Sequence, residues 1–291
     1  MLRLLVVLAG IGLAVLAAGL WLTRPVTVAP TEFAGLTGDA ARGETVYWAA
    51  GCASCHAEPE SDDKLLLAGG HRLVSPFGTF VAPNISSDAA EGIGGWTLVD
   101  FASAVRHGTS PRGQHYYPAF PYASYAQMTS GDLTDLWAFM QTLPPSTRAS
   151  EPHELGFPFN LRVSLGIWKA LYGTTGWVQP ADTPELERGR YLVEALAHCG
   201  ECHTPRTALG GLDTSQWMAG APNPSGEGRI PGLTPDQLDW SAVDIAYYLE
   251  SGFSPDFDSA GGTMASVVEN MARLSAADRA AIAAYVKALG G

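Results

Sequence analysis

Cysteine occurs at two places in this 291-residue chain, Cys52-Ala53-Ser54-Cys55-His56 and Cys199-Gly200-Glu201-Cys202-His203. Both motifs read C-x-x-C-H, the attachment signature of a c-type haem, in which two thiols bind the porphyrin and the histidine binds its iron. A zinc site would pair two C-x-x-C units about 15–20 residues apart, whereas the second motif begins 147 residues after the first. A thioredoxin-like redox pair would need a βαβ setting that the flanks do not suggest, and structural disulfides would leave both histidines unexplained.

The two motifs therefore predict two covalently attached haem c groups, each with its iron. No Ser/His/Asp set, glycine-rich phosphate loop or pair of carboxylates stands out, so no catalytic residue is predicted. The predicted porphyrin-binding residues are Cys52, Cys55, Cys199 and Cys202, and the predicted proximal iron ligands are His56 and His203.

The sequence around the first motif is repeated around the second at five separate places. In the last repeated segment, apolar residues stand at positions i, i+3, i+4 and i+7, which form one face of an amphipathic helix. We therefore predict two homologous helical domains, at 38–148 and 182–291, joined by a connector at 149–181. The matching pairs are Arg42-Gly43 and Arg188-Gly189, 82–85 and 230–233, Trp96 and Trp240, 108–111 and 252–255, and 132–143 and 278–289.

The order of helix, C-x-x-C-H motif, proline loop, second helix, methionine-bearing loop and last helix resembles the class I cytochrome c fold, present twice. Four stretches are similar to those of membrane-anchored dihaem cytochromes c and of the multihaem cytochrome c subunits of bacterial alcohol, gluconate and aldehyde dehydrogenases. Those subunits usually carry three haems, so the dihaem carriers are the closer match. The resemblance implies an all-α fold, with two tandem class I cytochrome c-like domains behind an N-terminal transmembrane helix. The four stretches are Pro76-Phe77-Gly78-Thr79, Pro83-Asn84-Ile85, Tyr117-Pro118-Ala119-Phe120-Pro121-Tyr122 and Gly261-Gly262-Thr263-Met264.

The resemblance also implies further residues at the two haem sites. Pro83 and Pro231 take the place of the proline that lies against the proximal imidazole, where a nearby carbonyl accepts the histidine Nδ1–H. An ordinary turn proline is the alternative for both. In the second domain, Met264 takes the place of the sixth iron ligand, and core filler is the alternative. A thioether ligand raises the reduction potential and closes the iron to small molecules.

The sixth ligand of the first haem is harder to assign. The register that leads to Met264 in the second domain leads to Phe120 in the first, and a phenyl ring cannot coordinate iron. Met128 is the predicted ligand, although it aligns with the apolar Leu274 when positions are counted back from the last helix. In that case Met128 would make an apolar contact that stabilises the start of the last helix of the first domain. The other candidates are His115, His107 and an open coordination site.

Residues 4–22 form an uncharged, proline-free apolar run of 19 residues, flanked by Arg3 and Arg24. A helix of that length spans about 28 Å, close to the ~30 Å hydrocarbon core of a bilayer. We predict a transmembrane anchor or signal at 1–23 and a tether at 24–37. A cleaved signal peptide has an apolar run of about 7–15 residues, and Trp21 suits a membrane interface, so an uncleaved anchor is favoured. The expected location is the cell inner membrane, with the haem domains on the periplasmic side.

Two further segments have open interpretations. Apolar residues of the connector spread over much of a short helix at 163–172, which predicts packing between the domains. Contact with the membrane surface or with a partner subunit is the alternative. His198, directly before Cys199, is expected to face solvent.

The composition limits the class of partner. Hydrophobic residues make up 46% of the chain and charged residues 16%, as expected for packed domains rather than disorder. The net charge is −12, from 17 basic and 29 acidic residues. Such a chain has no electrostatic reason to bind nucleic acid, and a partner with a basic face is expected.

The leading functional hypothesis is an electron carrier. A membrane-tethered dihaem cytochrome c would move single electrons from an exported dehydrogenase or a quinol-oxidising complex to an acceptor such as a terminal oxidase or a soluble cytochrome. A haem enzyme with an open first haem, either a dihaem peroxidase or a sulfur-compound oxidase, is the second hypothesis. The third is a dedicated cytochrome subunit of one dehydrogenase.

Overall fold

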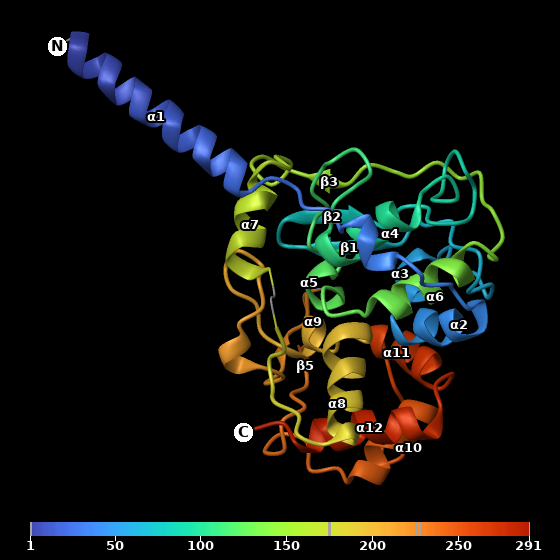
Figure 1. Cartoon of the computed structure of the whole chain (residues 1–291). Coiled ribbons are helices and arrows are strands. Elements are labelled where there is room, and N and C mark those ends of the chain that lie inside the picture. Colours follow the sequence, from blue (N-terminus) through green and yellow to red (C-terminus); the bar gives the residue numbers. More distant parts are fainter. Residues whose placement is uncertain (1, 174–175, 225, 227, 291) are drawn as a thin grey trace.

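The computed structural model describes residues 2–173, 176–224, 226 and 228–290, and Figure 1 shows α1 projecting away from two stacked domains. Before and within the first domain lie α1 (Leu2–Leu22), η1 (Pro30–Phe33), α2 (Ala40–Ala49), α3 (Cys52–His56), β1 (Arg72–Ser75), β2 (Gly78–Val81), α4 (Leu98–His107), α5 (Tyr122–Tyr125) and α6 (Ser130–Met140). The connector holds β3 (Glu154–Leu155) and α7 (Ser164–Tyr172). The second domain comprises α8 (Pro184–Arg190), η2 (Tyr191–Leu196), α9 (Gly200–His203), η3 (Thr214–Gln216), β4 (Ala221–Pro222), β5 (Arg229–Ile230), α10 (Ala242–Ser251), α11 (Thr263–Met271) and α12 (Ala276–Lys287).

The first and last helices of each domain cross at a glycine. Helix α2 meets α6 at Gly43, where a Cβ atom would stand 2.0 Å from the carbonyl oxygen of Asp135. Helix α8 meets α12 at Gly189, where a Cβ would stand 2.1 Å from the carbonyl oxygen of Ala281. Both glycines belong to the repeated Arg-Gly pair. The repeat therefore marks the point where two helix backbones touch, which no larger residue allows.

We expect Gly43→Ala to lower the free energy of unfolding of the first domain by about 3 kcal/mol, because the added methyl group must push α2 off α6. Gly131→Ala is the matched control, since Gly131 is also helical but a Cβ there meets only the Thr129 hydroxyl, at 3.8 Å. Its effect should stay within about 1 kcal/mol. Denaturant titration of the haem-loaded proteins measures both. Equal midpoints for the two variants would contradict the close crossing.

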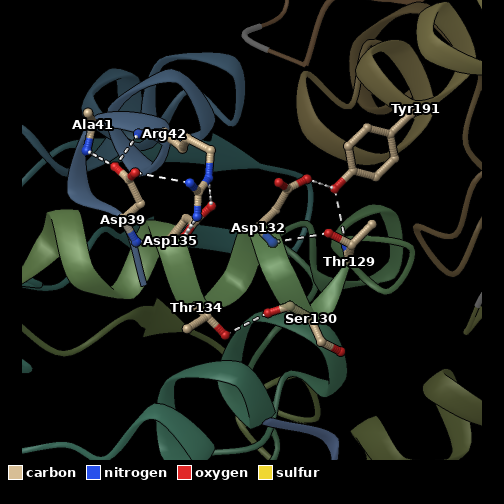
Figure 2. A network of polar contacts seen from close by, with 9 residues as sticks. All are labelled: Asp39, Ala41, Arg42, Thr129, Ser130, Asp132, Thr134, Asp135 and Tyr191. Atoms are coloured by element: carbon tan, nitrogen blue, oxygen red, sulfur yellow. Dashed lines mark hydrogen bonds and ion pairs between the residues drawn. The ribbon is translucent and has the colours of Figure 1, made fainter. Parts of the chain in front are cut away.

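Polar contacts support the same helix crossing on its solvent side, as Figure 2 shows. Asp39 caps α2 by accepting the backbone N–H of Ala41 at 2.9 Å, and it pairs with the Arg42 guanidinium at 3.0 Å. Arg42 Nε then donates to the Asp135 carboxylate on α6 at 2.7 Å. The Asp135 side chain is 7% exposed whereas that of Arg42 is 63% exposed, so the pair stabilises chiefly by satisfying a buried carboxylate.

Tyr191, the first residue of η2, reaches from the second domain to the first (Figure 2). Its hydroxyl accepts the backbone N–H of Thr129 at 3.1 Å and donates to the Asp132 carboxylate. Thr129 also caps α6, because its hydroxyl accepts the Asp132 N–H at 3.0 Å. The start of α6 is therefore one of the places where the two domains are joined.

The described residues contain short strands that the all-α prediction missed, although the chain remains mostly helical. Strands β1 and β2 form a hairpin in which Arg72 faces Val81, and β3 of the connector adds to it with Glu154 opposite Thr79. His153, next to β3, accepts the Val81 N–H at 3.1 Å. The small sheet thus fixes the start of the connector onto the first domain.

The segment 24–37, predicted as a tether, lies against the first domain. Val28 is buried and donates its N–H to the Ser103 hydroxyl at 3.1 Å, and Phe33 in η1 is buried as well. Glu32 forms an ion pair of 2.8 Å with Arg106 of α4. The two apolar residues bury enough surface to hold this segment against the first domain.

Helix α1 has no buried residue and, among the described residues, is the one helix long and apolar enough to cross a membrane. Its end is attached to the first domain, since His115 Nε2 donates to the carbonyl of Thr23 at 2.9 Å. Gly166 of α7 also lies against Thr23: a Cβ there would stand 2.3 Å from the same carbonyl oxygen. The prediction of an apolar N-terminal helix is confirmed, and the exposure of α1 excludes a core helix.

Candidate haem-attachment sites

Each attachment motif forms a single helical turn. In the first, Gly51 adopts φ +66° and starts α3, which brings Cys52 and Cys55 to the same side of the turn. In the second, Cys199 caps α9 and Cys202 lies three residues on. Two thiols on one face of one turn suit the two attachment points of one porphyrin edge.

The environment of the thiols argues against a redox pair. No disulfide bond involves any of the four cysteines. Burial raises the pKa of Cys52 and of Cys199 to about 12, and that of Cys55 to about 11. A thioredoxin-like pair needs the opposite shift, since its nucleophile is a thiolate at neutral pH.

The two motif histidines are held with one ring nitrogen free. Nδ1 of His56 lies 2.9 Å from the carbonyl oxygen of Pro83, and Nδ1 of His203 lies 2.8 Å from that of Pro231. A carbonyl oxygen can only accept, so Nδ1 carries the proton and Nε2 keeps its lone pair for a metal. Burial lowers the pKa of both imidazoles, which favours the neutral form that binds iron. These residues fit a haem at both motifs.

The proline loops are attached to the motifs by a repeated pair of backbone bonds. Gly69 N donates to the His56 carbonyl at 2.8 Å, and Gly220 N donates to the His203 carbonyl at 2.8 Å. Both glycines have positive φ and lie so close to the proline loop that a Cβ would clash with it. Sequence reasoning missed these two residues, although Leu67-Ala68-Gly69 and Met218-Ala219-Gly220 were available as a sixth matching pair.

We expect Gly69→Ala to destabilise the first domain by about 2 kcal/mol more than Gly35→Ala does. Both glycines have φ between +70° and +80°, so the alanine strain is shared. A Cβ at Gly69 would also stand 2.5 Å from the carbonyl carbon of Pro83, whereas nothing lies within 4 Å of one at Gly35. Thermal unfolding followed by circular dichroism measures the difference. Equal melting temperatures would show that the proline loop tolerates the methyl group.

The two motifs face each other across the domain interface through equivalent residues. Ser54, the third residue of the first motif, accepts a hydrogen bond from Asn270 Nδ2 of α11 at 2.8 Å. Glu201, the third residue of the second motif, accepts one from the Ser124 hydroxyl of α5 at 3.1 Å. Asn270 and Ser124 correspond in the internal repeat when positions are counted back from Asp278 and Asp132. The interface is therefore arranged with approximate two-fold symmetry around the attachment motifs.

His198 lies inside this interface, so the prediction that it faces solvent is wrong. Its ring packs edge-on against the ring of Tyr125, with centroids 5.5 Å apart. The Tyr125 hydroxyl donates to the carbonyl of Ala50 at 2.6 Å, two residues before Cys52. An aromatic pair thus connects the residue before Cys199 with the residues before Cys52.

Comparison with known proteins agrees with this geometry. The family model described as cytochrome c matches twice, at residues 40–144 and 186–290. The chain belongs to the cytochrome c family. The two matched ranges lie within the predicted domains at 38–148 and 182–291, and each contains one attachment motif.

The relatives of this cytochrome include a "Diheme cytochrome c-type" protein of Cereibacter sphaeroides, 61% identical over 284 residues that cover 96% of each chain. The cytochrome subunit of fructose dehydrogenase from Gluconobacter japonicus is 36% identical, and the cytochrome c subunit of gluconate 2-dehydrogenase from Pantoea cypripedii is 37% identical. Each of these two matches covers 89% of the chain, which spans only 54% and 63% of their lengths. The predicted cofactor is confirmed: the cytochrome carries two covalently bound haem c groups.

The candidate sixth ligands of the cytochrome occupy different surroundings. Met264 is the second residue of α11 and is partly buried against the core, and Met128 is fully buried three residues after the end of α5. Phe120 packs against the ring of Tyr125, with centroids 5.8 Å apart. The carbonyl of His115 accepts from Arg162 and that of His107 accepts from Lys169, so both histidines adjoin the connector.

Proposed function

We propose that this dihaem cytochrome c carries single electrons from a dehydrogenase or a quinol-oxidising complex, through both of its haems, to a terminal acceptor. The observation that carries the proposal is the interface between the attachment motifs, where the third residue of each motif is bound by the other domain. Each haem iron, when bound, holds or releases one electron. The names of the relatives point to electron carriers rather than enzymes, which supports the same function.

The residues of the chain position the two sites rather than react. Pro83 and Pro231 orient the proximal imidazoles, and Asn270 and Ser124 hold each motif against the opposite domain. The ring of His198 packs against that of Tyr125, which connects the segments that precede the two motifs. Fixed contacts of this kind keep reorganisation small when charge moves.

We propose Met264 and Met128 as the sixth ligands. Support for Met264 is its place at the start of α11, after Gly261 and Gly262, whose backbones have open space around them. Support for Met128 is its full burial three residues after Tyr125, whose hydroxyl binds the Ala50 carbonyl just before the first motif. Both candidate histidines instead have contacts with the connector or with the end of α1.

We further propose that α1 stays in the chain as an anchor in the inner membrane, with both domains on the periplasmic side. The contacts of Thr23 with His115 and Gly166 support this, because they integrate the end of α1 into the folded chain. The relatives named as dehydrogenase subunits support an exported dehydrogenase as donor. The net charge of −12 favours donors and acceptors with a basic docking face.

The test is transfer between the two sites after one electron is injected into the fully oxidised protein by pulse radiolysis. We expect a fast bimolecular reduction followed by a first-order phase whose rate does not depend on protein concentration. A variant with Cys199→Ser and Cys202→Ser, which keeps only the first attachment motif, should lose that phase. Purely bimolecular kinetics in the unmodified protein would contradict the proposal.

A further inference from the structure

We propose that the outer side of the connector rests on the surface of the lipid bilayer beside α1 and so fixes the orientation of the two haem domains; this rests on the membrane anchoring proposed above. The contact surface, called the connector face here, comprises Phe157, Phe159, Leu161, Val163, Ile167 and Leu171.

The connector face is apolar and open. Its six side chains are 44% to 79% exposed, and they follow one another within 15 residues. Val163, Ile167 and Leu171 are spaced four residues apart, so they form a stripe along one side of α7. Single exposed apolar residues are common on folded proteins, but a contiguous group of this kind marks a surface that is covered in use.

The charged residues of the connector beyond Leu155 point away from this face. Between Leu155 and Ala181 the sequence has only two, Arg162 and Lys169. Arg162 donates to the carbonyl of His115 at 2.9 Å and lies over the ring of Tyr117 at 4.6 Å. The charge of Arg162 is therefore satisfied by contacts within the first domain.

The charge of Lys169 is also satisfied by contacts within the first domain. Its Nζ donates to the carbonyl of Gly108 at 2.8 Å and lies 4.6 Å from the centre of the Tyr122 ring. With both cations turned inward, the connector face presents no charge in a protein of net charge −12. An uncharged, apolar face favours binding of an apolar partner. A basic protein partner would bind more favourably at acidic parts of the surface outside the connector face.

The position of α7 identifies that apolar partner as lipid. Gly166 of α7 lies against the carbonyl of Thr23, the first residue after α1, and Figure 1 shows α7 directly at the end of α1. Trp21 and Arg24 form a cation–π pair at 4.5 Å at this point, a combination typical of the membrane–water interface. The connector face is thus continuous with the place where the anchor leaves the bilayer, within reach of an apolar insertion of about 5–10 Å.

The experiment uses the full haem-loaded chain in vesicles of phosphatidylethanolamine and phosphatidylglycerol. Because the four native cysteines are in thioether bonds, a single introduced cysteine can be labelled with a nitroxide. Ile167→Cys reports on the connector face, Leu13→Cys on α1, and Val243→Cys on an exposed position of α10 in the second domain, where the native side chain is 77% exposed. Electron paramagnetic resonance then measures the accessibility of each label to oxygen, which enters lipid, and to a water-soluble nickel chelate.

We expect the label at Ile167 to resemble that at Leu13, with at least threefold greater accessibility to oxygen than to nickel, and the label at Val243 to show the reverse. A label at Ile167 as accessible to nickel as that at Val243 would refute the lipid contact alone. Shielding at Ile167 from both reagents would also refute it, and would assign the face to a second copy of the chain. Nickel access at Leu13 would refute the anchor and the lipid contact together.

Discussion

Replacing Met264 with leucine should lower the reduction potential of one haem by about 0.1 V or more and leave the other unchanged. Leucine keeps the volume of the side chain but removes the thioether, so packing is conserved while the ligand is lost. Axial ligands tune haem potentials over about 0.8 V, and methionine stands at the high end of that range. Spectroelectrochemical titration of both haems measures the shift.

Met271 supplies the matched control for this variant. It is also a methionine of α11, seven positions after Met264, and is buried in the core. Met271→Leu should change stability by less than about 1.5 kcal/mol and leave both potentials as they were. If Met264→Leu behaves like Met271→Leu, Met264 is core filler and the sixth ligand of the second haem is another group.

Met128→Leu applies the same reasoning to the first domain. A drop in the potential of the haem that Met264→Leu leaves unchanged would assign Met128 as its ligand. Two unchanged potentials would leave His107, His115 or an open site, and rapid binding of carbon monoxide by the reduced first haem would identify the open site. That last result would favour the enzymatic hypothesis over the carrier.

Glu194→Ala should destabilise the second domain by about 3 kcal/mol. Glu194 is buried in η2, where its carboxylate accepts the backbone N–H groups of Val178 at 2.7 Å and Gln179 at 3.1 Å. It also accepts the hydroxyl of Tyr285 on α12, and burial raises the pKa of that phenol, which keeps it a donor. Truncation would leave the buried Tyr285 hydroxyl and two partly buried backbone N–H groups without this acceptor.

Two further variants isolate the role of these hydrogen bonds. Glu194→Gln keeps one acceptor oxygen and should lose about half as much stability, whereas Glu187→Ala, at an exposed position of α8, should stay within about 0.5 kcal/mol. Guanidinium unfolding of the haem-loaded proteins gives the three values. If Glu194→Ala were as stable as Glu187→Ala, the carboxylate would not hold the end of the connector against the second domain.

Short-range patterns in the sequence predict much of this molecule. The C-x-x-C-H spacing is sufficient to predict the cofactor. The internal repeat is sufficient to predict two domains, each with an amphipathic last helix. The repeated Arg-Gly pair was recognised from sequence, but its cause, the contact of Gly43 with Asp135, joins residues 92 positions apart and needs the structure.

The features that the sequence does not predict share one physical cause. The sequence of 24–37 does not show that this segment lies against the first domain, because the position of Val28 depends on a bond with Ser103 of α4. The sequence around His198 does not show its position in the interface, because its partner, Tyr125, belongs to the other domain. Strand β3 is only two residues long and exists because β2 offers it an edge. Contacts between distant segments decide each of these features, and periodicity does not record them.

The central claim is that two haems are bonded covalently to this polypeptide, and the intact mass of the purified chain tests it most directly. The protein should be produced in cells able to mature c-type cytochromes, and free haem should be removed by acid extraction before mass spectrometry. We predict the mass of the polypeptide plus two haems, and plus one haem when Cys199 and Cys202 are replaced by serine. A mass equal to the bare polypeptide, or to the polypeptide plus a single haem in the unmodified chain, would contradict the account.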